Sequence, residues 1–214
     1  MPVEVLDVGR MPYPAAWELQ KRLVEERSEG VIEDTLVLVE HDHVITLGKK
    51  TTPENFKPQD IPVFQVERGG DATYHGPGQL VGYPIVRLPS PNVHAFVRGL
   101  EDALVEATRK FGVDSEKVEG HTGVWVEGRK LASIGVAVSN WVTYHGFALN
   151  VNTDMSYFHL IKPCGLDPET MTSMEALTGT KLEMEAVKRE VVRNFSGVFQ
   201  TQLVEGAAPF PNAL

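Results

Sequence analysis

Short segments in which apolar and polar residues alternate run through the first two thirds of the chain. This pattern restricts the possible folds most, because a period of two is typical of strands that bury one face. The clearest cases are Val3 to Val8, Thr35 to Glu40, Ile61 to Glu67 and Leu131 to Val138. Turns rather than helices separate most of these segments. We therefore predict an α+β fold in which helices pack on a mixed β-sheet.

Three segments have helical periodicity instead. The first runs from Pro14 to Glu29, and the second runs from Asn92 to Phe111 and begins with a typical cap residue. The third, from Glu183 to Val204, is amphipathic. No repeat or linker divides the chain. We predict one domain over residues 1–214, with residues 183–214 as a C-terminal helical appendage.

Composition excludes several classes of protein. The chain has 214 residues, of which 42% are hydrophobic and 23% charged. These shares are ordinary for globular proteins. A net charge of -9 argues against nucleic-acid binding, because that function needs clustered cations.

Three further features indicate the cellular compartment. The single cysteine excludes an internal disulfide. The acidic N-terminus does not resemble a signal peptide. No apolar run approaches the length of a membrane span, which is roughly 20 residues. We expect a cytoplasmic protein that binds neither nucleic acid nor a membrane.

Three details of the strand pattern carry further expectations. Two histidines, His41 and His43, stand between short predicted strands, and no third ligand is spaced to join them, so we expect a turn and no metal. Pro84 lies inside the apolar segment Leu80 to Leu88, which predicts an edge strand or a bulge. His145 interrupts a later strand, where we expect a buried core residue.

The single cysteine, Cys164, lies between Pro163 and Gly165, so its segment should be a fixed loop. Lys130 stands at the start of a predicted strand. In the simplest alternative the cysteine is an inert buried residue and the lysine is solvated. However, the cation Lys162 and exposed backbone amides would lower the pKa of the thiol. Our hypothesis is a thiolate nucleophile that is served by a lysine.

The stretch from Arg68 to Gln79 is dense in glycine and lies between two apolar strands. It is longer than a hairpin needs. Because Gly69 and Gly70 would let a ligand approach the main chain, we predict a cleft lined by backbone, and the alternative is a pair of turns. The stretch is not a phosphate loop, since the Gly-Lys-Ser/Thr ending is missing.

Three segments together resemble the octanoyltransferases of lipoate biosynthesis. The first is Arg68 to Gln79, the second runs from Gly128 to Asn150, and the third is Pro163 to Leu166 with Thr172-Ser173 downstream. Each segment alone is a weak match, but the three in this order are highly specific. The match covers the chain from about Val39 to Leu177.

The resemblance implies the catalytic fold of the biotin and lipoate protein ligases. It also implies an enzyme that takes an octanoyl group from acyl carrier protein onto Cys164 as a thioester and passes it to a lysine of a lipoyl domain. The implied acceptors are the lipoyl domains of 2-oxoacid dehydrogenase complexes and the glycine cleavage H protein. Lys130 matches the family lysine that lowers the thiol pKa and serves as a base. No cofactor is implied, because exchange between thioesters needs no nucleotide.

The resemblance further implies which residues bind substrate. They are Arg68, Gly69, Gly70, Asp71, Ala72, Thr73, Tyr74, His75, Ser133, Ile134, Gly135, Gly146, Phe147 and Ala148. The chain departs from the family at Ala137 and Asn140, where relatives often carry basic residues. This departure leaves open where acidic partners dock, because a chain of net charge -9 needs a local positive patch to meet them.

Two alternative functions remain open at the level of sequence. An ATP-dependent lipoate or biotin protein ligase has the same fold, but it activates a carboxylate as an adenylate and needs no cysteine. A non-catalytic protein that binds acylated carrier domains would depend on its pocket residues and not on Lys130.

Overall fold

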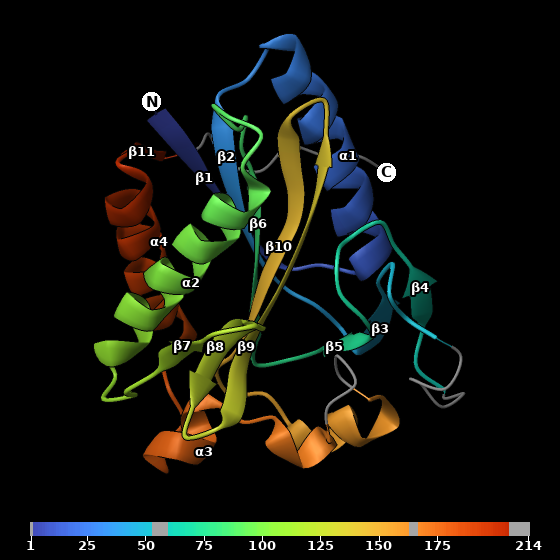
Figure 1. The fold of residues 1–214 in the computed structure, drawn as a ribbon, viewed down its shortest axis with the longest axis vertical. Coiled ribbons are helices and arrows are strands. Elements are labelled where there is room, and N and C mark those ends of the chain that lie inside the picture. Colours follow the sequence, from blue (N-terminus) through green and yellow to red (C-terminus); the bar gives the residue numbers. More distant parts are fainter. Residues whose placement is uncertain (1, 53–59, 163–166, 206–214) are drawn as a thin grey trace.

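The computed structural model describes residues 2–52, 60–162 and 167–205, and these residues form a mixed eight-stranded sheet at the centre of the molecule (Figure 1). The strand order is β11-β1-β2-β6-β10-β9-β8-β7. The bounds are β1 Pro2–Arg10, β2 Asp34–Glu40, β6 Gln79–Ile85, β7 Glu116–Val118, β8 His121–Val126, β9 Arg129–Ser139, β10 Val142–Asn150 and β11 Gln202–Glu205. Strand β1 pairs in parallel with β2 and β11, whereas the other pairs are antiparallel. The predicted α+β class with a mixed sheet is confirmed.

Helices cover both faces of this sheet (Figure 1). Helix α1, Tyr13–Glu29, lies on one face, while α2, Val93–Arg109, and α4, Met184–Phe199, lie on the other. Shorter elements follow β10, namely the 3-10 helices η2 Met155–Leu160 and η4 Pro168–Thr170 and the helix α3 Met174–Thr178. The first two predicted helices are therefore confirmed.

The third predicted helix is too long at its C-terminal end. Helix α4 stops at Phe199, because Gln200 adopts the left-handed conformation with φ of 51°. Residues 202–205 then form β11, which pairs with β1 at the edge of the large sheet. Amphipathic periodicity predicted the helix correctly but could not predict the strand that follows.

A second sheet of three strands stands beside the large one. It has the order β4-β3-β5, with β3 Val44–Leu47, β4 Val63–Gln65 and β5 Thr73–His75. Strands β2 and β3 therefore belong to different sheets, and the chain bends at Asp42 and His43 between them. His41 is fully buried, and its ring nitrogens lie 2.8 Å from Met11 O and 2.7 Å from Tyr83 Oη.

Of the edge strand or bulge predicted at Pro84, the edge strand is wrong. Strand β6 lies between β2 and β10 in the middle of the sheet. The ladder between β6 and β10 instead stops after the pair Phe147 and Gly82 and resumes only at the bridge between Arg87 and Val142. Proline has no N–H to donate to β10, which explains the gap. His145 lies in this gap with a positive φ of 54°.

Two apolar clusters fill the space between the large sheet and its helices. The cluster beneath α2 and α4 includes Leu100, Leu104, Leu149 and Phe195. The cluster beneath α1 is smaller and includes Val37 and Tyr83. Within the described part of the chain, no helix is long and apolar enough to cross a membrane.

Candidate active site

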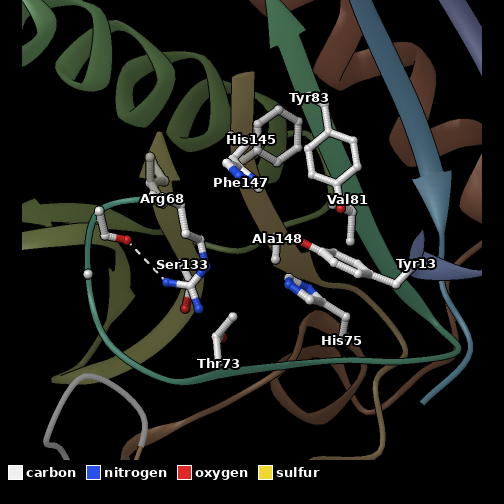
Figure 2. A pocket seen from close by; sticks show the side chains of 15 residues that line it. Tyr13, Arg68, Thr73, His75, Val81, Tyr83, Ser133, His145, Phe147 and Ala148 are labelled. Atoms are coloured by element: carbon white, nitrogen blue, oxygen red, sulfur yellow. Dashed lines mark hydrogen bonds between the residues drawn. The ribbon is translucent and has the colours of Figure 1, made fainter. Parts of the chain in front are cut away.

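Three segments that are far apart in the sequence meet around one narrow cavity, which has a volume of about 40 Å³ (Figure 2). The segments are the loop 68–70 with β5, the middle of β9, and the second half of β10. The lining residues are Tyr13, Arg68, Gly69, Gly70, Thr73, His75, Val81, Tyr83, Ser133, Ile134, Gly135, His145, Gly146, Phe147 and Ala148. The structure thus brings together eleven of the fourteen residues that the resemblance implies for substrate binding.

The remaining three residues lie elsewhere. Ala72 and Tyr74 are fully buried beneath the small sheet, in an apolar cluster with Phe158 and Met171. The hydroxyl group of Tyr74 lies 2.8 Å from Nδ1 of His43. Asp71 lines a neighbouring groove instead of the cavity. The alternation of strand β5 separates Tyr74 from Thr73 and His75, which face the cavity.

Four lining residues were not predicted from the sequence as part of the site: Tyr13, Val81, Tyr83 and His145. Alternation along β6 places Val81 and Tyr83 on the same face, but only the three-dimensional structure shows that this face borders the cavity. Tyr13 comes from the first turn of α1, where its ring stacks on His75 at an interplanar angle of 8°. The burial expected for His145 is confirmed, but its ring also faces the cavity (Figure 2).

Glycines allow the loop 68–70 to lie directly against β9. A Cβ atom on Gly135 would stand 2.7 Å from the carbonyl oxygen of Gly69, a distance that real Cβ atoms do not show. The Gly69 N–H donates to Val136 O at 3.0 Å. Gly70 has a φ of +85°, and residues with side chains rarely adopt such a conformation. On this side the wall of the cavity is therefore main chain, as the predicted cleft requires.

Arg68 fixes this loop from inside. Its guanidinium donates from Nη2 to Thr46 O at 2.7 Å and from Nη1 to Gly69 O at 3.1 Å. Thr46 lies near the end of β3. Only 8% of Arg68 is exposed. Its charge is therefore held within the protein by oriented carbonyl groups, and Arg68 shapes the cavity wall.

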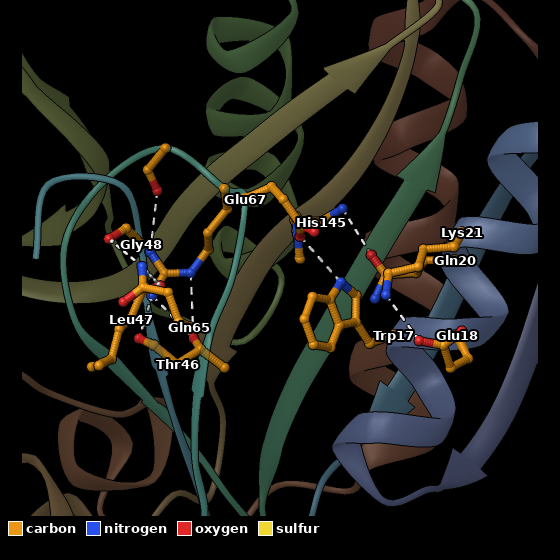
Figure 3. A network of polar contacts seen from close by, with 12 residues as sticks. Trp17, Glu18, Gln20, Lys21, Thr46, Leu47, Gly48, Gln65, Glu67 and His145 are labelled. Atoms are coloured by element: carbon orange, nitrogen blue, oxygen red, sulfur yellow. Dashed lines mark hydrogen bonds and ion pairs between the residues drawn. The ribbon is translucent and has the colours of Figure 1, made fainter.

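A second polar network holds His145 in its unusual backbone conformation (Figure 3). The side-chain oxygen of Gln20 accepts from the His145 N–H at 2.8 Å, and Glu67 accepts from Trp17 Nε1 at 3.2 Å. Nε2 of His145 lies 3.5 Å from Glu67 Oε2, which is too long for a well-formed hydrogen bond. Burial, aided by Arg68, lowers the pKa of His145 to about 4. His145 is thus a neutral ring at neutral pH.

Burial also keeps the other two histidines near the cavity neutral. It lowers the pKa of His41 to about 4 and the pKa of His75 well below its ordinary value, because burial penalises the charged form. Burial raises the pKa of the phenol of Tyr13 and that of Tyr83. The inner wall of the cavity therefore carries polar groups without formal charge, apart from Arg68.

Lys130 lies at the start of β9, next to the cavity. Only 4% of this residue is exposed, and its Nζ lies 5.3 Å from the centroid of the Trp125 ring. Its backbone forms an isolated bridge with Met171, and its carbonyl accepts from the Thr172 N–H at 3.0 Å. Cys164 lies outside the described residues, so the contact between Lys130 and Cys164 stays a prediction. In the described part of the chain, no three His, Cys, Asp or Glu side chains are grouped closely enough to hold a metal ion.

A groove beside the cavity leads to Lys130 from the surface. It shares Gly69, Gly70, Ile134 and Gly135 with the cavity, so the two spaces have a common wall. The other side chains that line it are Lys50, Asp71, Val93, His94, Val97, His121, Thr122, Trp125, Lys130 and Val136. Among the described residues of this lining, Asp71 is the single acid and two are lysines. The groove therefore differs from the acidic protein as a whole.

Comparison with known proteins gives the family of the chain. A model of the lipoyl protein ligase A/B catalytic domain matches residues 12–196. An octanoyltransferase from Solibacter usitatus is 45% identical over 94% of both chains, and one from Syntrophotalea carbinolica is 46% identical over 94% of this chain and 96% of its own.

Solved structures of low identity share the fold. A lipoate-protein ligase A bound with ATP has a TM-score of 0.77 at 17% identity, covering 96% of this chain and 89% of its own. A bi-partite lipoate protein ligase from Thermoplasma acidophilum has a TM-score of 0.73 at 16% identity, covering 95% and 87%. A biotin protein ligase from Aquifex aeolicus has a TM-score of 0.53 at 12% identity, covering 94% and 69%. The chain therefore belongs to the lipoyl protein ligase A/B catalytic-domain family, and within that family to the octanoyltransferases.

Proposed function

We propose that the chain acts as one catalytic domain that transfers an octanoyl group from acyl carrier protein, through a thioester on Cys164, to a lysine of a lipoyl domain. The observation that carries this proposal is the cavity itself. Its wall is built mainly from two of the three segments that resemble octanoyltransferases. The backbone of Lys130 is bonded to residues 171 and 172, which follow Cys164 by only seven and eight positions.

In the first proposed step the Cys164 thiolate attacks the carbonyl carbon of the octanoyl thioester. A new carbon–sulfur bond forms and the bond to the donor sulfur breaks. The donor sulfur takes up the proton that Lys130 received from the Cys164 thiol and leaves as a thiol, so Lys130 is neutral for the second step. In the second step the amine of the lipoyl lysine attacks the Cys164 thioester. It gives up a proton to Lys130, and the Cys164 thiolate leaves as the amide forms. Neither step consumes a nucleotide.

The side chains that line the groove beside Lys130 favour binding of the anionic donor over binding of the cationic acceptor. A carrier protein presents its acyl group on an arm that includes a phosphodiester, whereas the acceptor presents a lysine. Lys50 and the N–H groups of His94 and His121 can donate to a phosphate, and Lys50 would repel an ammonium group. We therefore propose that the donor arm lies in this groove. The proposed acceptors are lipoyl domains, including those of 2-oxoacid dehydrogenase complexes and the glycine cleavage H protein.

Intact-protein mass spectrometry tests the function directly. The purified protein is incubated with octanoyl-acyl carrier protein and then with a lipoyl domain, after apyrase has removed ATP. We expect the mass of one octanoyl group to appear on Cys164 and then to move to the lipoyl domain. A Cys164→Ala variant should form neither product. Transfer that requires ATP and survives Cys164→Ala would favour the ligase alternative.

A further inference from the structure

Buried residues form one continuous series of hydrogen bonds behind the cavity. The series begins at Arg68, ends at Lys130, and passes through Thr46, His75, Gln79, Asn150 and Thr172. None of these seven residues is more than 8% exposed. The series connects the loop that forms the cavity wall with the residues that follow Cys164.

Asn150 is the central member of this series, and its orientation is fixed. Its Nδ2 donates to Thr172 O at 3.0 Å, and its Oδ1 accepts from Gln79 Nε2 at 2.9 Å. Gln79 Nε2 also donates to Tyr74 O at 3.1 Å. Because a carbonyl oxygen can only accept, the carbonyls of Thr172 and Tyr74 determine which end of each amide is the NH2 group.

The same logic determines the tautomer of His75. The remaining oxygen of Gln79 lies 2.8 Å from Nδ1 of His75. Since that oxygen can only accept, Nδ1 must carry the single proton of the neutral ring. Nε2 is then an acceptor, 3.4 Å from Thr46 Oγ1. That hydroxyl accepts from Arg68 Nη2 at 3.0 Å, which directs its own proton toward His75. Every hydrogen bond of the series therefore donates in one direction, from Arg68 toward Lys130.

The series ends at the backbone of Lys130. The N–H of Thr172 donates to Lys130 O at 3.0 Å, and Met171 is paired with Lys130. Asn150 thus holds Thr172 from one side while Lys130 holds it from the other. A buried network of this kind is sensitive to the loss of one donor, because each remaining partner would be left unsatisfied.

We propose that Asn150 is a positioning residue for octanoyl transfer. It sets residues 171 and 172 against Lys130, and through Gln79 and His75 it couples this arrangement to the cavity wall. The proposal rests on the proposed function, since it assumes that Cys164, seven residues before Met171, is the acylated residue.

Asn152 provides a matched control. It has the same side chain and also clamps a backbone segment, because its Nδ2 donates to Leu182 O at 2.8 Å and its Oδ1 accepts from the Leu182 N–H at 2.9 Å. It lines a different cavity, with Glu40 and Lys181. Asn152→Ala and Asn150→Ala should therefore both lower the melting temperature, but only Asn150→Ala should affect the transfer chemistry.

The decisive measurement is the pH dependence of alkylation of Cys164 by iodoacetamide. The thiolate sulfur displaces iodide. Because the chain has one cysteine, the alkylation rate measures the ionisation of Cys164 alone. We expect Asn150→Ala to move the midpoint of the profile upward by about one pH unit and to slow acylation by octanoyl-acyl carrier protein about tenfold. Asn150→Asp, which is nearly isosteric, keeps the acceptor for Gln79 but loses the donor to Thr172, and it should shift the profile in the same direction.

Two results would overturn the proposal. The first is that both Asn150 variants give the same alkylation profile as the wild type, while at least one of them is folded. The other is an equal shift in Asn152→Ala, because a shift shared by both sites would report only lost stability. Alkylation uses no octanoyl group. Suppose that the wild type accepts no octanoyl group and that only the Asn150 variants shift the profile. This result would refute the proposed function, but it would still show that Asn150 controls the reactivity of Cys164.

Discussion

The cluster beneath α2 and α4, which we call the packed core, differs in kind from the cavity region formed by the loop 68–70, β5, β10 and their neighbours. The packed core buries mostly aliphatic and aromatic side chains such as Leu100 and Phe195, which are each 1% exposed. The cavity region buries Arg68 and three neutral histidines around a narrow cavity. Close packing gives stability, whereas space and oriented polar groups allow binding and chemistry. Substitutions in the two regions should therefore separate stability from activity.

The largest effect should come from Lys130. Lys130→Met removes both the charge and the base, so both half-reactions should slow by about 10² to 10⁴ fold. Lys130→Arg keeps the charge but cannot give up a proton, so it should retain some acylation of Cys164 and transfer poorly to the lipoyl domain. Single-turnover measurements of each half-reaction, with thermal melting to check folding, distinguish the variants. Wild-type rates in a folded Lys130→Met protein would remove Lys130 from the mechanism.

Leu100→Ala tests the packed core. Leu100 is 1% exposed within the cluster beneath α2 and α4. Its truncation should lower the free energy of unfolding by about 2 to 5 kcal/mol. The rate of acylation per folded molecule should stay within about twofold, because Leu100 does not line the cavity or the groove. Chemical denaturation and active-site titration measure the two quantities. A folded variant with a large loss of activity would show that the two regions are coupled.

The buried histidines of the cavity region should make stability depend on pH. The pKa of His41 is about 4 in the folded protein and near its ordinary value of 6.5 in the unfolded chain. The unfolded chain therefore takes up a proton first as the pH falls, and stability is lost between pH 6.5 and pH 4. His41 alone should contribute a loss of about 2 kcal/mol between pH 6.5 and pH 5. Denaturation of the wild type and of His41→Gln at pH 7 and pH 5 measures the contribution of His41. Equal pH dependence of stability in the two proteins would contradict the prediction.

Gly70→Val should have the smallest of these effects. We expect it to lower the rate of Cys164 acylation about tenfold. The substitution places a branched side chain at a φ of +85°, beside Arg68 Nη1 in the cavity wall. Gly30→Val is the control, because Gly30 has a similar φ of +78° but no atom within 4 Å of its Cβ position. Both variants should lose stability through backbone strain. Equal acylation rates in folded Gly70→Val and wild-type proteins would show that this part of the loop is not a cavity wall.

The sequence predicted the parts of the molecule that depend on local pattern. Alternation predicted strands such as β1, β2, β4 and β9, and helical periodicity predicted α1 and α2 closely. The density of glycine from Arg68 to Gly78 predicted a surface lined by main chain. Each of these signals is contained in a window of about a dozen residues, which is the range over which periodicity and turn chemistry act.

What the sequence could not predict depends on contacts between distant segments. Tyr13 belongs to the cavity because its ring stacks on His75 of the small sheet, and no local signal indicates this. Pro84 was expected at an edge or a bulge, but its missing N–H instead opens a central ladder opposite His145. The order of donors from Arg68 to Lys130 joins residues up to 126 positions apart, from Thr46 to Thr172. Such features arise only when the tertiary structure forms.

The pairing of β11 with β1 has a consequence for how the molecule protects itself. The pair joins Pro2 to Gln202, which are 200 positions apart. It therefore closes a very long loop and should form late in folding. Until it forms, β1 presents a row of unpaired N–H and C=O groups to any neighbouring chain. A short strand near the end of the sequence thus acts as a cover against association between incompletely folded copies.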